Sequence, residues 1–200
     1  GRNIAENIAL LDREVILLTA VGEDHFGQKI IKETAASGVD MNYVKRVDRE
    51  KTGLYLAHLN QEGELIGAVS DMKVLDYIDI DYLKSKRRVI EQASFLIFDT
   101  NLSQKSISYL CNLAQSKNLK VMVEPVSIEK SAKLSTHLDS LDYITPNILE
   151  AENLLGCENY KEATFSKTID RLKDLYNAKS DILPVMIVSC AEKGVLLLKS

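Results

Sequence analysis

Cysteine is scarce in this 200-residue sequence, and the three cysteines lie far apart. Cys111, Cys157 and Cys190 each stand among apolar residues, a setting typical of ordinary packing positions. Their odd number and wide spacing argue against a disulfide framework and against a zinc site. The sequence therefore favours a reducing, cytoplasmic compartment.

Long runs of one charge and long apolar runs are also missing. The 29 acidic and 25 basic residues are interspersed, and the basic stretch SKRR at residues 85–88 is short. Nucleic acid is therefore not an expected partner. No apolar run approaches the roughly 20 residues that cross a bilayer, and the first residues lack the order of a signal peptide. With 46% hydrophobic residues, we expect one globular domain over residues 1–200 and no membrane partner.

Several common catalytic signatures are absent. The sequence contains neither GxxxxGK[ST] nor GxGxxG, so the two commonest phosphate-binding loops are excluded. His25, His58 and His137 have no ligand-like spacing, which argues against a zinc site. A serine nucleophile elbow, GxSxG, is missing as well. A nucleotide site in this chain must therefore be of another type.

What the sequence does contain is an alternation of apolar strands and helices. Helices are predicted at residues 1–11, within 22–38 ending at Gly38, and at 103–116, 129–138, from 147, and 165–176. Strands are predicted at residues 14–21, 94–99, 119–125, 142–146, 184–190 and 194–200. This order predicts an α/β fold, doubly wound, with a mostly parallel sheet and helices on both faces. Because the chain begins inside a helix and stops on a strand, we expect a fold truncated at both ends.

One segment, at about residues 44–72, departs from this rhythm. LYLAHL alternates, NQEGE forms a polar turn, and ELIGAV returns, which together predict a β-hairpin. A hairpin inserted in an α/β chain is expected to act as a flap or lid. An exposed β edge invites pairing, so the lid is the expected contact if a homodimer forms.

The stretch TPNILEAENLLG places Asn147 and Glu150 three residues apart at a predicted helix start. This spacing is typical of a capping box, in which each side chain bonds the other residue's backbone N–H. The same spacing puts an amide oxygen and a carboxylate on one helix face, where they could hold hydrated magnesium. Asp99 and Glu124, which end neighbouring predicted strands, could likewise be paired carboxylates or simple turn residues. The residues alone leave these alternatives open.

Together these segments resemble the PfkB, or ribokinase-like, family of sugar and nucleoside kinases. GRNIAENIALL resembles the end of the family's Gly-Gly motif, AVGEDHFGQKIIKETAASGVD its VGxDxxG segment, and TPNILEAENLLG its TxNxxE signature. TGLYLAHLNQEGE resembles the lid hairpin, and the similarity runs in order through nearly the whole chain. GRNIAEN, SDM, DTNLS and EPVS are similar to segments of the subgroup that phosphorylates pseudouridine.

The resemblance implies transfer of the γ-phosphoryl group of ATP, with Mg²⁺, to the 5′-hydroxyl of a small nucleoside or sugar. Pseudouridine is the substrate that it favours. It also implies six site residues. They are Gly1, Asn3 and Asp71 for the substrate, Asn147 and Ser189 for ATP, and Glu150 for the metal.

Departures from the family pattern are equally specific. The family's first strand, with its substrate-binding Asp, and the GAGD segment, with its catalytic Asp, are absent. SCAEKG replaces TxGxxG, with Ala191 at a glycine position. No catalytic base can therefore be named, and the chain alone is expected to be inactive. Two alternatives stay open: another sugar or nucleoside kinase, such as a ribokinase or adenosine kinase, or a non-catalytic binding protein of the same fold.

Overall fold

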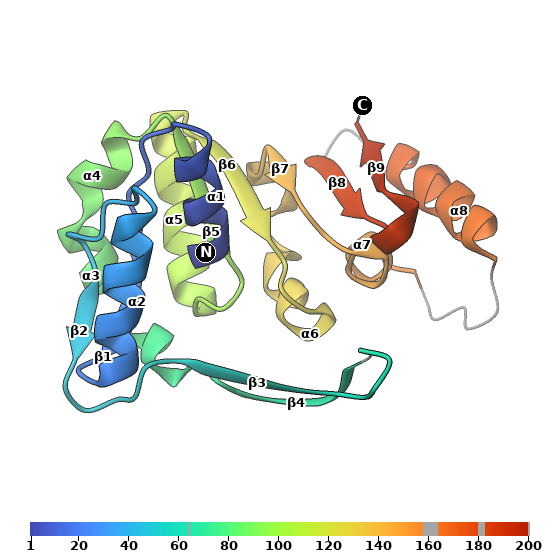
Figure 1. Cartoon of the computed structure of the whole chain (residues 1–200). Helices are drawn as coiled ribbons and strands as arrows, with labels where there is room; N and C mark the ends of the chain where they lie inside the picture. Colours follow the sequence, from blue (N-terminus) through green and yellow to red (C-terminus); the bar gives the residue numbers. More distant parts are fainter. Residues whose placement is uncertain (64, 158–163, 180–182, 200) are drawn as a thin grey trace. The chain divides into compact units, whose positions relative to one another are not determined.

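The computed structural model describes residues 1–63, 65–157, 164–179 and 183–199 (Figure 1). The chain divides into two compact units, Gly1–Lys86 and Arg87–Ser200, and each is described by itself. Within the described residues, none of the helices combines the length and the apolar character needed to span a membrane. The three cysteines are free, as their scattered positions predicted.

The first unit begins with two helices and a pair of short parallel strands. Its elements are α1 (Arg2–Leu10), β1 (Ala20–Gly22), α2 (His25–Ala36) and β2 (Lys45–Val47). Strands β1 and β2 pair in parallel from Ala20↔Lys45 to Gly22↔Val47. The helices predicted at residues 1–11 and within 22–38 are confirmed, and α2 is followed by Gly38 at φ 93°.

The strand predicted over residues 14–21 is wrong in extent. Regular pairing starts only at Ala20, and the preceding segment makes a single isolated bridge, Ile16↔Asp40. The reason lies in the partner segment, which turns at residues 42–43 between Asp40 and Lys45. A continuous ladder cannot form against a chain that turns away from it.

The VGEDHFG segment packs α2 closely against β1. A Cβ on Gly27 would lie 2.2 Å from the Gly22 carbonyl oxygen, so the close approach requires glycine there. Asp24 caps α2 by accepting the Gly27 N–H at 2.8 Å. Its carboxylate also accepts the Thr52 N–H at 2.8 Å and the Thr52 hydroxyl at 2.7 Å, which fixes the base of the following hairpin.

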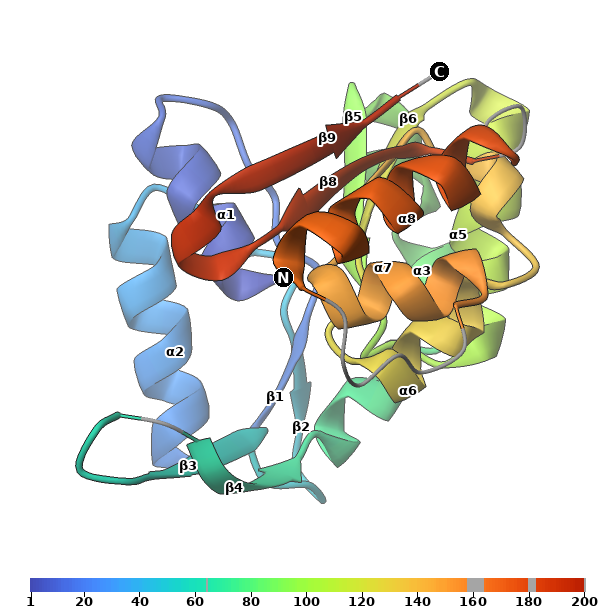
Figure 2. The same cartoon turned by 90° about the vertical axis from the view of Figure 1, so that its right-hand side faces the viewer.

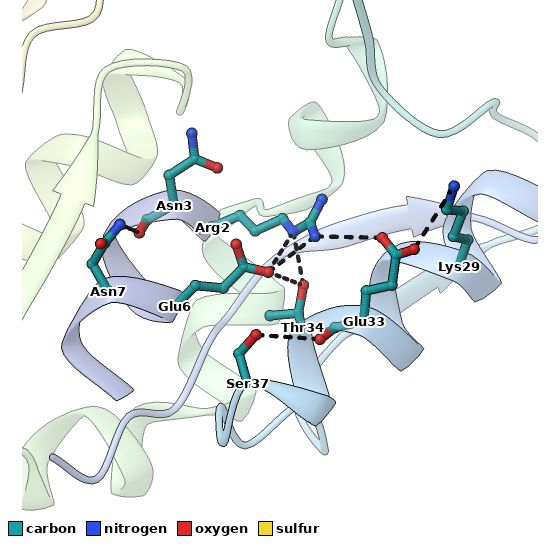
Figure 3. Close-up of polar contacts among 8 residues, drawn as sticks. All are labelled: Arg2, Asn3, Glu6, Asn7, Lys29, Glu33, Thr34 and Ser37. Carbon is teal, nitrogen blue, oxygen red and sulfur yellow. Dashed lines mark hydrogen bonds and ion pairs between the residues drawn. The ribbon is translucent and has the colours of Figure 1, made fainter. Parts of the chain in front are cut away.

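Helix α1 is attached to α2 through polar side chains (Figure 3). The fully buried Thr34 hydroxyl accepts Arg2 Nε–H at 2.8 Å and donates to Glu6 Oε1 at 3.1 Å. Arg2 Nη2 lies 2.9 Å from Glu6 Oε1 and 3.8 Å from Glu33 Oε2. Asn3 and Asn7 form a separate pair on α1, in which Asn7 Nδ2 donates to the Asn3 carbonyl at 2.7 Å.

A long antiparallel hairpin projects from the body of the first unit (Figure 1). It consists of β3 (Leu54–Leu59) and β4 (Leu65–Asp71), followed by a 3₁₀ turn at Lys73–Tyr77 and by α3 (Ile80–Ser85). The predicted hairpin is confirmed, with its regular strands starting at Leu54, whereas Lys45–Val47 pairs with β1. Every residue of β3 is exposed to solvent.

The second unit contains a five-stranded sheet in the order β5-β6-β7-β8-β9. Its strands are β5 (Phe95–Asp99), β6 (Lys120–Glu124), β7 (Tyr143–Ile144), β8 (Val185–Ser189) and β9 (Val195–Leu198). Its helices are α4 (Arg87–Gln92), α5 (Gln104–Lys117), α6 (Ile128–Ser131), α7 (Ile148–Leu155) and α8 (Phe165–Asn177). All neighbouring strands are parallel except β8 and β9, so the mostly parallel sheet is confirmed.

The core of this unit lies between the sheet and its helices. Val121, Val123 and Ile144 on the central strands are almost completely buried, as is Leu172 of α8. Helix α7 contacts both α8 and β8, and Figure 2 shows α7 and α8 side by side. The sheet thus gives α7 a rigid support at its start, where Asn147 lies.

The helix predicted over residues 129–138 is wrong. Helix α6 ends at Ser131, and short 3₁₀ turns follow at Ala132–Leu134 and Leu138–Ser140. Serine hydroxyls bond nearby carbonyls in this segment: Ser131 Oγ donates to Ile128 O and Ser140 Oγ to His137 O, both at 2.7 Å. Such local bonds compete with continued α-helix.

Candidate functional site

A pocket of about 390 Å³ lies where the parallel strands of the second unit end. Its lining residues belong to or follow β6, β7 and β8, lie in the first turn of α7, or begin β9. They are Glu124, Val126, Thr145, Asn147, Glu150, Ile187, Ser189 and Val195. Ligands of parallel α/β sheets bind at the carboxyl ends of the strands, which is where these residues gather.

Asn147 and Glu150 form the predicted capping box at the start of α7. Asn147 Oδ1 accepts the Glu150 N–H, and Glu150 Oε2 accepts the Asn147 N–H, both at 2.9 Å. Asn147 also forms a parallel bridge with Ser189, whose N–H donates to the Pro146 carbonyl at 2.8 Å. The structure therefore brings together three of the predicted site residues, Asn147, Glu150 and Ser189.

The carboxylate of Glu150 is unusually placed for a charged group, with only 4% of the residue exposed. Burial raises the pKa of Glu150, the Asn147 N–H opposes the shift, and the nearby charge of Glu124 adds to it. Among the described residues, no hydrogen bond reaches the second oxygen, Oε1. The cap thus uses one oxygen of a carboxylate that also lines the pocket.

Glu124 is a second carboxylate in the same pocket. Its Oε2 accepts the Thr145 hydroxyl at 2.6 Å, and its Oε1 lies 3.4 Å from the Val126 N–H. Glu124 is the register partner of Asp99, as their positions at strand ends predicted, but Asp99 Oδ1 accepts the Asn101 N–H. The Glu124–Thr145 pair was not predicted, and its sequence signal is a carboxylate and a hydroxyl at the ends of adjacent strands.

These groups fit a divalent cation by their chemistry. Mg²⁺ prefers oxygen ligands, binds through one or two carboxylates, and keeps several waters. Glu124 and Glu150 supply two such carboxylates in one pocket. Within the described residues no group of three or more His, Cys, Asp or Glu side chains could hold a metal ion.

The turn from β8 to β9 retains a glycine-like backbone at a non-glycine residue. Ala191, which stands at a glycine position of the family motif, has φ 50°. Gly194 has φ 91°, and its carbonyl accepts the Cys190 N–H at 2.9 Å. Left-handed backbone favours glycine, so Ala191 keeps the conformation at an energetic cost.

The three predicted substrate residues belong to the first unit. Gly1 caps α1, and Asn3 lies exposed in its first turn. Asp71 ends β4 and accepts the Lys73 N–H at 3.2 Å. All three are therefore accessible at element ends.

A larger hollow of about 700 Å³ lies elsewhere in the first unit, between α2 and β2. It is lined by Ile31, Ala35, Gly38, Val39, Asp40, Met41, Asn42, Val44 and Arg46. It contains none of the predicted site residues and only one carboxylate. We therefore take the smaller pocket with its two carboxylates as the candidate site.

Comparison with known sequences identifies relatives of this chain. The chain matches the pfkB family carbohydrate kinase description over residues 1–200. It is 37% identical over 156 residues to pseudouridine kinase of Escherichia coli K12, covering 78% of this chain and 49% of that one. It is 26% identical over 179 residues to ribokinase of Bacillus subtilis, covering 90% of this chain and 57% of that one. The chain thus spans about half the length of the curated relatives it matches.

Solved structures have the same fold. A carbohydrate kinase from Agrobacterium tumefaciens superposes with a TM-score of 0.78 at 25% identity, covering 94% of this chain and 57% of that one. A ribokinase from Cryptococcus neoformans in complex with ADP gives a TM-score of 0.79 at 18% identity, covering 100% and 63%. The predicted ribokinase-like α/β fold is confirmed.

Proposed function

The chain belongs to the pfkB family of carbohydrate kinases, and from this premise we propose that its strand-end pocket binds the magnesium complex of ATP. The observation that carries the proposal is Glu150, a nearly buried carboxylate that caps α7 with one oxygen and lines a pocket shared with Glu124. Asn147 and Ser189, joined by a backbone bridge, provide the proposed contacts to ATP.

The proposed reaction is transfer of the γ-phosphoryl group to a primary hydroxyl. Such transfer is catalysed mainly by positioning and by neutralising charge on the phosphoryl oxygens. Glu124 and Glu150 would hold the magnesium ion, which supplies the charge neutralisation when bound. The hydrogen bonds from Asn147 N–H and Thr145 fix the directions of the two carboxylates before any ligand arrives.

We propose pseudouridine as the substrate. Support comes from the 37% identity to pseudouridine kinase of Escherichia coli and from the GRNIAEN, SDM, DTNLS and EPVS segments. Gly1 and Asn3 are proposed to bind the ribose hydroxyls, and Asp71 is proposed to lie near the nucleoside. The second candidate is a different sugar or nucleoside kinase, which the 26% identity to a ribokinase favours.

We further propose that the hairpin is a lid and that its outer face pairs with a second copy of this chain. Strand residues alternate between faces, so Leu54, Leu56, Val69 and Asp71 share one face. Tyr55, Ala57, Ala68 and Ser70 share the other. If Asp71 serves the substrate, its face is the inner one, and the exposed Tyr55 remains for the second copy. The free cysteines agree with a cytoplasmic location.

The test of function is a phosphorylation assay on the full-length natural protein with Mg-ATP and a panel of acceptors. Pseudouridine should be the best acceptor, with uridine and ribose poorer. Equal or better turnover of ribose or adenosine would contradict the substrate and leave the family unaffected.

The same assay on Glu150→Gln tests the pocket. Gln preserves a capping box but carries no charge, so kcat should fall about 100-fold and the Mg²⁺ requirement should rise, with little change in melting temperature. Glu152→Gln is the matched control, because Glu152 lies on the same helix but does not line the pocket. Near-normal kinetics of Glu150→Gln across a magnesium titration would remove Glu150 from the site.

A further inference from the structure

Val126 has a backbone conformation that its side chain disfavours. Its φ is 67°, in the left-handed region, where a β-branched residue is a genuine outlier. The other non-glycine residues with positive φ in the described part of the chain are Asp12, Asn118 and Ala191. None of these is β-branched, so Val126 is the most strained of the four.

Hydrogen bonds of the residues on both sides of Val126 fix this backbone conformation. The Ser127 N–H donates to the Pro125 carbonyl at 2.8 Å, which closes a three-residue γ-turn of the rare, positive-φ type around Val126. The Pro125 carbonyl also accepts the hydroxyl of Thr100, a completely buried residue. Ser127 Oγ in turn caps α6 by accepting the Lys130 N–H at 3.2 Å. A strained residue persists only where its surroundings over-determine it, and this turn meets that condition.

The turn itself does not explain why the residue is valine. Glycine would adopt this φ without a steric penalty, and asparagine tolerates it. What valine adds is an apolar side chain, 38% exposed, on the wall of the pocket. With Ile187 and Val195 it forms the apolar part of a lining that also contains the carboxylates of Glu124 and Glu150.

An apolar wall beside two carboxylates changes what they can bind. Restricting water lowers the local dielectric and strengthens the attraction between a carboxylate and a cation. The apolar shell around a metal site controls solvent access in this way. The backbone of Val126 is tied to one of these carboxylates as well, through the contact between its N–H and Glu124 Oε1 at 3.4 Å.

We propose that Val126 is a positioning residue whose side chain, held at the pocket by the strained turn, limits water at Glu124 and Glu150 and so strengthens binding of the nucleotide's divalent cation. The inference rests on the proposed function, because it concerns the same pocket. It adds a residue whose apolar side chain acts on the surroundings of both carboxylates.

The experiment compares Val126→Asn and Val126→Gly with the wild-type full-length protein. Both variants keep the turn and remove the apolar group, so the strain is relieved and the wall is lost. The melting temperature of Val126→Asn should rise by about 2–4 °C. By isothermal titration calorimetry, affinity for Mg·ADP should fall about tenfold, while affinity for ADP in EDTA should be unchanged. Val126→Ile, which keeps a β-branched apolar group, is the matched control and should bind Mg·ADP as wild type does.

Different outcomes separate the inference from the proposed function. If Val126→Asn is more stable and binds Mg·ADP as tightly as wild type, the strain is incidental and the inference is wrong. If it is less stable than wild type, valine serves packing, and the inference is again overturned. If Val126→Asn does not fold, Val126→Gly answers the same question through the same two measurements. A wild-type protein that does not bind Mg·ADP would overturn the proposed function and this inference with it.

Discussion

Asp24 accepts three hydrogen bonds, and their effect is visible in its acidity. The N–H and hydroxyl of Thr52, followed by the N–H of Gly27, favour the charged carboxylate and lower the pKa of Asp24 from 3.8 to about 2. A folded-state pKa below the unfolded one contributes stability above pH 4. That contribution is lost as the pH falls through the range from about 4 to about 2.

The prediction concerns Asp24→Asn. Near pH 7 the variant should melt below wild type, because Asn can cap α2 but cannot offer Thr52 a charged acceptor. The difference in melting temperature should narrow as the pH is lowered from 4 toward 3, since the wild type then loses its advantage. Thermal unfolding of both proteins across this range is the measurement. Asp48→Asn, at an exposed position, is the control. A difference that stays constant down to pH 3 would contradict the assignment.

At the scale of single residues, the sequence predicted some of the residues that line the pocket. Spacing alone placed Asn147 and Glu150 at a helix start, and their capping box formed as predicted because it depends on local geometry. The pair of Glu124 and Thr145 lies 21 residues apart, and it forms only because β6 and β7 are adjacent in the sheet. The left-handed turn at Val126 has no local signal at all, since valine is the last residue that such a backbone would favour.

At the scale of elements, the β3–β4 hairpin is one that a binding partner would stabilise. An isolated two-stranded hairpin is marginally stable in water, and both faces of this one carry exposed apolar residues. Tyr55 is 55% exposed on the proposed outer face, and Val69 is 68% exposed on the face of Asp71.

We therefore predict that Tyr55→Lys weakens self-association, because a lysine on the outer face would be buried against the second copy without a partner charge. Sedimentation velocity over a range of micromolar concentrations measures the effect. Val69→Lys, on the opposite face, should leave the sedimentation coefficient of wild type unchanged and should affect substrate binding instead. Equal effects of the two variants on association would contradict the assignment of the faces.

Elements with strong periodicity were predicted well, and those decided by competing bonds were not. Helices α5 and α8 were predicted nearly to their ends, α2 was predicted to stop at Gly38, and α7 was predicted at its start, since each combines an apolar face with a recognisable start or stop signal. The helix at residues 129–138 failed because serine hydroxyls there bond the backbone locally. The strand at residues 14–21 failed because its extent depends on a turn in its distant partner.

For the whole molecule, the prediction is that the 200-residue chain has no kinase activity by itself. It carries the proposed metal carboxylates and the proposed lid, but no GAGD segment, which in the family pattern supplies the base and the anion-binding helix start. A general base typically contributes about 10² to 10⁴-fold, and losing the anion site as well should bring turnover below detection. Residues 1–200, expressed alone, should leave pseudouridine and ribose unphosphorylated, with the full-length protein as positive control. Robust turnover would show that a base exists within the chain.

The polar attachment of α1 makes the position of this helix sensitive to the salt concentration. Ala5 is the buried residue of α1, and polar groups add to the attachment of the helix: Arg2, Glu6, Glu33 and the Thr34 hydroxyl, with Lys29 3.7 Å from Glu33. Arg2 also stands in the first turn of α1, where a positive charge opposes the helix dipole. Added salt screens partly exposed ion pairs, whereas an apolar contact would be strengthened or unaffected by it. The seating of α1, and with it the placement of Gly1 and Asn3, is therefore set in part by ionic strength.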